Sequence, residues 1–279
     1  MKILLFQAPM TQLNTPYPAL PYLTAWLREK GYDVTQKDLS LELALGLFTR
    51  SGLERIERGA EKTKKSKRSP PLESFLAQTA DYFDSIEPAI RFLQGKDPSL
   101  ALRIATRNFL PEGPRFSPLD EHPELLDNFG SLGVQDLAKY FASLFLDDIA
   151  DAIRDGVDDR FHFSRYGERL AASQASFSLL HENLEAPATV VDEILREITQ
   201  AHLERERPDV VGISAPFAGN VYAALRIGKL VKEYSPKTKI LLGGGYVNTE
   251  LRELSDPRVF DYVDFLTYDF VAYQPGTSI

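Results

Sequence analysis

The residues best suited to ligand chemistry follow three short apolar runs. Residues 7–14 follow the run at 3–6, residues 214–220 follow the run at 209–214, and residues 243–246 follow the run at 239–242. Ligands of open parallel sheets bind beyond the carboxyl ends of the strands, where the strand order reverses. We therefore expect one ligand site built from these three loops.

Three consecutive glycines, Gly243, Gly244 and Gly245, come directly after one of these runs. Without a Cβ, they let another backbone or a bulky ligand approach closely. A glycine turn that only satisfies a positive φ is the structural alternative. The triplet is compatible with both interpretations.

Ser214 ends another apolar run and is followed by Pro216 and Gly219. Such a loop combines a hydrogen-bonding hydroxyl with little bulk, although the serine could equally be a helix-cap partner. The first loop has no Gly-x-Gly-x-x-Gly fingerprint, and no Walker lysine is present. The loops therefore favour a large flat or elongated ligand over a dinucleotide.

Other catalytic constellations are absent from the sequence. No histidine pair has the i, i+3 or i, i+4 spacing of a helical metal site, and no Gly-x-Ser-x-Gly nucleophile elbow occurs. The paired aspartates at 147–148 and 158–159 are more simply solvated charges or helix starts. We predict neither a catalytic residue nor a metal ligand. The four histidines are His122, His162, His181 and His202.

Composition narrows the classes of function. The 279 residues include 32 Lys and Arg against 40 Asp and Glu, a net charge of −8, and no cysteine. The chain can therefore hold no cysteine-ligated cluster, and its acidity disfavours nucleic-acid binding. The basic stretch at 62–68 is a solvated segment or a polyanion contact. With no signal peptide and no apolar run of about 20 residues, we expect a soluble, cytoplasmic protein without a membrane partner.

The elements that position the loops alternate between strand and helix. We predict strands at 3–6, 32–35, 209–214, 239–242 and 263–268. A helix follows the first strand, with Pro21 in its first turn and Gly31 after its end. Another runs from an N-cap at Asn220 to a stop before Pro236, and a short one extends from 248 to about 255. This alternation predicts an α/β fold, a flavodoxin-like (Rossmann-like) doubly wound parallel sheet.

A large, mainly helical insertion interrupts this pattern. Residues 49–205 have few β-branched runs, and several of their segments place apolar residues on one helical face. We therefore assign 1–48 and 206–269 to a discontinuous α/β domain and 49–205 to the insertion. Residues 270–279 form a tail that can be disordered.

The α/β segments resemble a known family. The stretch from Pro16 to Val34, the run at 209–214, and Leu242 to Tyr246 followed by Asp264 are similar to the N-terminal cobalamin-binding region of cobalamin-dependent radical S-adenosylmethionine (radical SAM) proteins. The resemblance covers about 1–48 and 206–269. It is carried by the ordered set of segments, since no single motif decides it.

The resemblance implies a domain that binds cobalamin with its nucleotide tail between strands, beside the Ser214 loop and the three glycines. The corrin would lie over the first loop, and His162, which is set among aromatic residues, could cover its upper face. The implied cofactor-binding residues are Gln7, Ala8, Pro9, Met10, His162, Ser214, Pro216, Phe217, Gly219, Asn220, Gly243, Gly244, Gly245 and Tyr246.

Two departures from the family pattern limit what this chain could do. The first loop has no histidine, so a lower-face cobalt ligand from it is not expected. The chain also has no cysteine for the [4Fe-4S] cluster and ends where the radical SAM barrel should begin, which suggests a truncation. S-adenosylmethionine and the cluster would belong to a barrel supplied in cis or in trans, and this chain would not be catalytic alone.

Two other classes of function stay open. The same loops could form a flavodoxin-like nucleotide- or sugar-nucleotide-binding domain. The chain could also be a partner-docking domain with no ligand.

Overall fold

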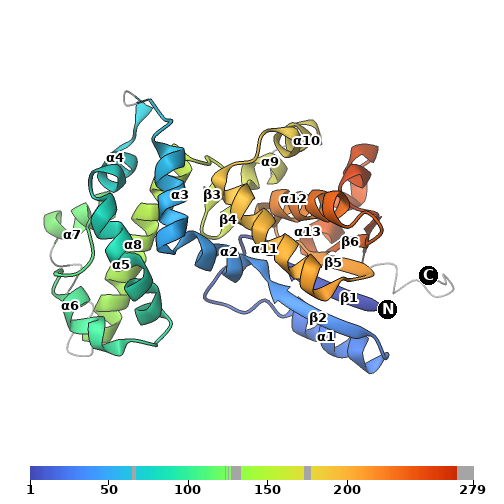
Figure 1. Ribbon diagram of the computed structural model, residues 1–279, viewed down its shortest axis with the longest axis horizontal. Coiled ribbons are helices and arrows are strands. Elements are labelled where there is room, and N and C mark those ends of the chain that lie inside the picture. The colour runs from blue at the N-terminus through green and yellow to red at the C-terminus, as the bar shows by residue number, and fades with distance from the viewer. Residues whose placement is uncertain (65–66, 123, 125, 127–132, 173–176, 269–279) are drawn as a thin grey trace. The chain divides into compact units, whose positions relative to one another are not determined.

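The protein folds into two compact units, seen in the ribbon of a computed structural model (Figure 1). One unit contains residues 1–44 and 162–279, and the other contains 45–161. The structure describes residues 1–64, 67–122, 124, 126, 133–172 and 177–268. The tail predicted at 270–279 lies outside the described residues.

A five-stranded, all-parallel sheet forms the centre of the first unit. Its strands are β1 (Lys2–Gln7), β2 (Asp33–Asp38), β5 (Val210–Ser214), β6 (Lys239–Gly243) and β7 (Phe265–Leu266). The spatial order is β2-β1-β5-β6-β7. Counted along the sheet's own strands this is 2-1-3-4-5, the flavodoxin-like doubly wound order. The predicted fold class is therefore confirmed.

The remaining elements of the first unit are mostly helices. They are α1 (Ala19–Glu29), α9 (Glu168–Ala172), α10 (Ser178–Glu185), α11 (Val190–Glu206), α12 (Ala218–Tyr234) and α13 (Gly245–Thr249), with the 3₁₀ turns η5 (Leu251–Glu253) and η6 (Pro257–Asp261). The two strands β3 (Phe161–His162) and β4 (Arg165–Tyr166) form a small separate sheet. Helix α2 (Leu39–Leu47) and strand β3 each cross a boundary between the units.

The second boundary differs from the one drawn from the sequence. Residues 162–205 group with the α/β unit, whereas the sequence pattern assigned them to the insertion. The physical reason is packing, since α9 and α11 both contact α12. Helical periodicity identified α11, but periodicity alone cannot indicate which core a helix joins.

Local signals fixed most element ends and failed at two of them. Helix α1 ends before Gly31, whose φ of +83° is the left-handed conformation that favours glycine after a helix. Helix α12 begins at Ala218, two residues before the predicted cap, and the Asn220 side chain instead accepts a hydrogen bond from the Phe217 N–H. The predicted helix at 248–255 is replaced by the shorter α13 and the turn η5.

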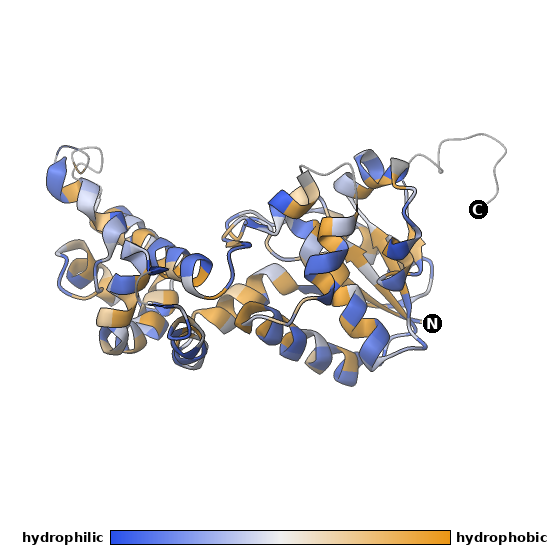
Figure 2. Ribbon diagram, turned by 90° about the horizontal axis from the view of Figure 1, so that it is seen from above, coloured by the Kyte–Doolittle hydropathy of each residue, from blue (hydrophilic) through white to orange (hydrophobic). Residues whose placement is uncertain are grey.

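One face of the sheet packs against α11 and is fully buried. The Phe6 ring lies 6.0 Å from the ring of His202 in α11. In register with Leu4 and Phe6, the side chains on this face are Val211, Ile213, Ile240 and Leu242. Figure 2 shows how the helices alternate between hydrophilic and hydrophobic residues within each turn, as expected for elements with one face on a core.

The second unit is helical. Its helices are α3 (Arg50–Ala60), α4 (Pro70–Ala77), α5 (Thr79–Leu93), α6 (Ala101–Ala105), α7 (Ser117–Glu121) and α8 (Val134–Gly156), with the 3₁₀ turns η2 (Pro98–Leu100) and η3 (Pro114–Phe116). Helix α8 contacts α3, α4, α5 and α6. Inside this core the rings of Tyr82 and Phe145 stack at 5.4 Å.

Within the described ranges, no helix is long and apolar enough to cross a bilayer. The basic stretch leaves Lys62, Lys64 and Lys67 exposed, while residues 65–66 lie outside the described residues.

Candidate functional site

The candidate site lies where the strand order reverses, between β1 and β5. Gln7 is the register partner of Ser214, so the last residues of the two strands lie side by side. The backbone continues this pairing, because the Ala8 N–H donates to the Ser214 carbonyl at 3.1 Å. Two of the three predicted loops therefore meet at the expected edge of the sheet.

An uncharged, buried polar cluster fills this point. The Gln7 amide donates to Thr11 Oγ1 at 2.9 Å, and that hydroxyl donates to the Ala8 carbonyl at 2.9 Å. Asn220 Nδ2 lies 3.4 Å from the same carbonyl and 3.3 Å from Thr11 Oγ1. Ser40 joins from α2, accepting from the Thr11 N–H and donating to the Thr11 carbonyl. We call Gln7, Thr11, Ser40, Ser214 and Asn220 the switch-point cluster.

Two atoms of the switch-point cluster have no protein partner. In the part of the chain that the structure describes, the buried atoms Gln7 Oε1 and Ser214 Oγ make no hydrogen bond. The two residues are only 3% and 6% exposed, so bulk water does not readily replace the absent partners. A buried polar group left unpaired costs about 1–3 kcal/mol. The helix-cap alternative for Ser214 also disappears, because its hydroxyl caps nothing.

The glycine triplet serves a close approach of backbone. A Cβ at Gly244 would lie 2.7 Å from the Ala215 carbonyl oxygen, and one at Gly245 would lie 2.9 Å from that of Pro216. The Ala215 N–H also donates to the Gly243 carbonyl at 2.8 Å. The loops after β5 and β6 therefore touch directly, and the space that the missing side chains leave is filled by the protein's own backbone.

A segment that was assigned to the insertion covers the start of α12. A Cβ at Gly219 would lie 2.6 Å from that of Arg165 in β4. The Arg165 guanidinium pairs with Glu168 at 2.7 Å. Tyr246 ties the loop after β6 to α9, since its hydroxyl donates to the Ala171 carbonyl at 3.0 Å. Burial, together with the nearby Glu250, raises the pKa of Tyr246, so this phenol stays protonated as a donor.

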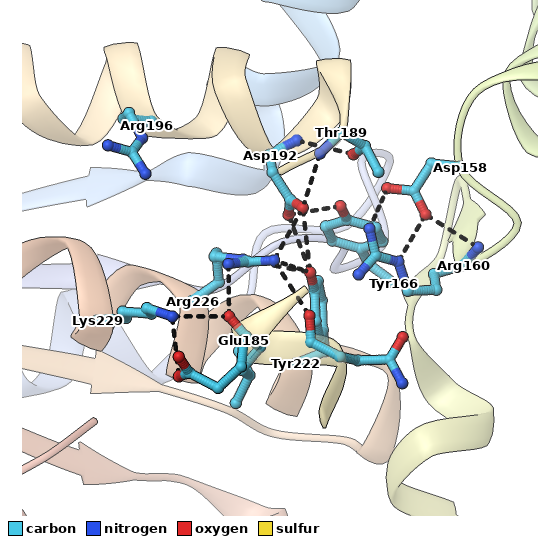
Figure 3. Close-up of polar contacts among 12 residues, drawn as sticks. Asp158, Arg160, Tyr166, Glu185, Thr189, Asp192, Arg196, Tyr222, Arg226 and Lys229 are labelled. Carbon is cyan, nitrogen blue, oxygen red and sulfur yellow. Dashed lines mark hydrogen bonds and ion pairs between the residues drawn. The ribbon is translucent and has the colours of Figure 1, made fainter. Parts of the chain in front are cut away.

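A second buried polar cluster anchors the covering segment (Figure 3). The Asp192 carboxylate accepts from Tyr166 Oη at 2.8 Å and from Tyr222 Oη at 3.1 Å, and pairs with Arg226 Nη2 at 3.1 Å. Arg226 also donates to the Leu184 carbonyl at 2.8 Å. We call Asp192, Tyr166, Tyr222 and Arg226 the Asp192 cluster. It joins β4, α10, α11 and α12.

The predicted site residues differ in accessibility. Ala8, Pro9, Met10, Pro216, Gly219 and Asn220 are buried or half-buried in the fold, so a ligand could reach few of their atoms. Phe217 is exposed, and its ring makes an edge contact with Tyr17 at 6.0 Å. His162 is half-buried on β3, in the same small sheet as Arg165.

Three residues around this site were not predicted from the sequence. Thr11 and Ser40 belong to the switch-point cluster, and Tyr17 touches Phe217. Thr11 lies within the first predicted loop, so its hydroxyl was a visible signal. Ser40 lies 29 residues beyond Thr11, and no sequence pattern indicated that they would pair.

No match was found between this chain and any family model, any curated protein or any solved structure. Its function must therefore be argued from its own residues. Among the described residues, no three His, Asp or Glu side chains lie close enough together to hold a metal ion.

Proposed function

We propose that the α/β unit is a cobalamin-binding module related to those of radical SAM enzymes. One observation carries the proposal: Gln7 Oε1 and Ser214 Oγ are buried, unpaired and side by side at the reversal point of the sheet. Cobalamin carries amide side chains, which can donate to an unpaired oxygen. A ligand that satisfied both atoms would recover the cost of burying them.

Neutral charge at the strand ends supports the same ligand. Residues 7–15, 214–220 and 243–249 contain no Lys or Arg. The nearby Arg165 is already paired with Glu168. Nucleotide phosphates bind where cations or the first N–H groups of a helix face them. The uncharged lining therefore favours an amide-rich ligand over a nucleotide or a sugar nucleotide.

The fit to cobalamin is restricted to one part of the edge. Gln7 and Ser214 suit an amide-rich ligand, and the exposed Phe217 ring offers an apolar contact beside them. A nucleotide tail between the β5 and β6 loops does not fit, because the backbones of Ala215 and Pro216 fill that space. We therefore restrict the proposed contacts to the β1–β5 edge. When bound, cobalamin would supply organometallic chemistry, for which this chain contributes binding residues only.

A spectroscopic titration tests the proposal. The purified chain is titrated with hydroxocobalamin and with methylcobalamin, following the visible spectrum and the heat of binding. We expect saturable one-to-one binding, which Ser214→Val weakens at least about tenfold, or 1.4 kcal/mol. The matched control is Thr199→Val, because Thr199 Oγ1 is also buried and unpaired but lies in α11, where we propose no contact.

Other outcomes assign the site differently. Binding of a nucleotide or sugar nucleotide, with none of cobalamin, would favour the nucleotide-binding alternative. A folded chain that binds neither would contradict the proposal and favour the partner-docking alternative. A supplied radical SAM barrel, in cis or in trans, remains the partner that the proposal implies.

A further inference from the structure

The two faces of the sheet are covered unequally. Strands β5 and β6 alternate between fully buried side chains on the α11 face and half-buried residues on the α1 face. On the α1 face, Leu5 is in register with Gly212, Gly212 with Leu241, and Leu241 with Phe265. Parallel sheets normally have helices on both faces.

Helix α1 covers only the first part of this row. Its Leu20 and Leu27 pack with Ile3, Leu5 and Val34 of strands β1 and β2. Beyond it, Gly212 and Leu241 are only half-buried and the Phe265 side chain is 53% exposed. We call Gly212, Leu241 and Phe265 the bare strip. It spans three strands, or about 10 Å, which is close to the diameter of a helix.

Helix α1 itself has a second apolar side, which is largely exposed. Tyr22 is 77% exposed, Trp26 is 54% exposed and Leu23 is nearly half exposed. Only Leu20 and Thr24 of this helix are buried. We call Tyr22, Leu23 and Trp26 the α1 ridge. The ridge and the bare strip lie next to each other on the same side of the sheet.

We propose that a second copy of this chain docks on this face. A two-fold axis parallel to the strands, above the border between α1 and the bare strip, would put the α1 ridge of each copy on the bare strip of the other. The two α1 helices would then lie side by side between the two sheets. This is an isologous contact, in which one patch is complementary to itself.

The available apolar area suits such a dimer. The exposed parts of Tyr22, Trp26 and Phe265 amount to about 400 Å² per copy, taking roughly 200 Å² for a whole aromatic side chain. Two copies therefore contribute about 800 Å² at the centre of a contact that typically needs at least about 1,200 Å² in all. The rim, which includes the Lys239–Asp264 pair at 3.4 Å, can supply the remainder.

A second copy accounts for more of the surface than a foreign helix does. A single helix from another protein would fill the bare strip and leave the outer side of the α1 ridge in water. The second copy covers both at once, because each chain supplies a ridge and a strip. Lys239 is already paired with Asp264, so docking would not bury that ammonium group without a partner.

Sedimentation equilibrium and tryptophan fluorescence of the full chain test the dimer. Trp26 is the only tryptophan, so its emission reports directly on the α1 ridge. With rising concentration we expect the mass to approach that of two chains while the emission shifts to the blue. Phe265→Gln should weaken association at least about tenfold, and so should Tyr22→Gln.

A matched control and two contrary outcomes make the test decisive. Phe260→Gln changes an equally exposed phenylalanine whose carbonyl accepts a hydrogen bond from Lys232 of α12, so it should leave the dimer intact. A monomer at about 100 μM would overturn the proposal. Blue-shifted emission on adding an amphipathic helical peptide, with the chain still monomeric, would also overturn it by assigning the strip to a foreign helix.

Discussion

Two buried polar clusters in the α/β unit are built in opposite ways. The Asp192 cluster buries a charge, and each oxygen of its carboxylate is met by a hydroxyl or by the Arg226 guanidinium. The switch-point cluster buries no charge, yet it leaves Gln7 Oε1 and Ser214 Oγ unpaired. Both involve α12, which carries Asn220 in its first turn and Tyr222 and Arg226 further along.

The difference separates a structural role from a binding role. A fully paired cluster has nothing left to offer a ligand, and removing one member exposes the others to an unfavourable environment. An incompletely paired cluster weakens the fold until something binds it. Mutations in the two clusters should therefore change different quantities: stability in the first and affinity in the second.

The largest effect is expected from Arg226→Leu in the Asp192 cluster. This change leaves the Asp192 carboxylate buried without its cation, which should lower the free energy of unfolding by about 3–5 kcal/mol in urea titrations followed by circular dichroism. Arg196→Leu, on the same stretch of α11 as Asp192, is the control. Its ion pair with Glu233 is exposed and 3.7 Å long, so it should cost less than about 1 kcal/mol. Similar costs for both variants would refute the structural role.

Gly244→Ala should have the next largest effect, about 2–3 kcal/mol of lost stability. The residue has a φ of +113°, and its new methyl group would meet the Ala215 backbone. Gly31→Ala serves as the control, because Gly31 has a φ of +83° but no other atom lies within 4 Å of the place its methyl group would occupy. If the two variants cost the same, the loops after β5 and β6 separate easily and the tail slot that we excluded becomes available.

Asp148 extends the comparison to the helical unit, where a buried carboxylate is held by the backbone N–H groups of Gly113 and Arg115. Burial raises its pKa from 3.8 to about 6, and the two hydrogen bonds only partly oppose that rise. The folded state therefore holds more protons between pH 4 and 6. The contribution of this group to stability is full below about pH 4 and is lost as the pH rises to 6.

The pH dependence can be isolated with one variant. Relative to Asp148→Asn, the wild-type free energy of unfolding should fall by about 2–3 kcal/mol from pH 4 to pH 6.5. Asp136→Asn changes an exposed carboxylate on the same helix, α8, and should show no such dependence. A difference between wild type and Asp148→Asn that stays constant with pH would contradict the expectation.

The smallest effect on stability is expected from Ser214→Ala. Because its hydroxyl is buried without a partner, its removal should change the free energy of unfolding by less than about 0.5 kcal/mol. Tyr166→Phe in the paired cluster removes a 2.8 Å bond to Asp192 and should cost about 1–3 kcal/mol. A large loss of stability in Ser214→Ala would mean that the hydroxyl has a structural partner, and would remove the basis for a ligand there.

Sequence patterns predicted the sheet well because its signals are local. Most of its strands are apolar runs of the length expected for a covered parallel strand, and Gly31 and Pro236 mark helix ends by their own backbone preferences. The three loops were found for the same reason, since they follow the strands directly. Helix starts were less certain, as Asn220 shows: it bonds to the Phe217 N–H from inside α12.

By itself, the sequence determined the strand–helix alternation, the three loops at one edge, and the lack of a thiolate for any cluster. Only the tertiary structure decided that residues 162–205 belong with the sheet, that Ser40 reaches Thr11, and that the glycines admit backbone. The reason is that these features depend on groups far apart in the chain. Apolar periodicity indicates that a face must be buried, but only packing selects the partner that buries it.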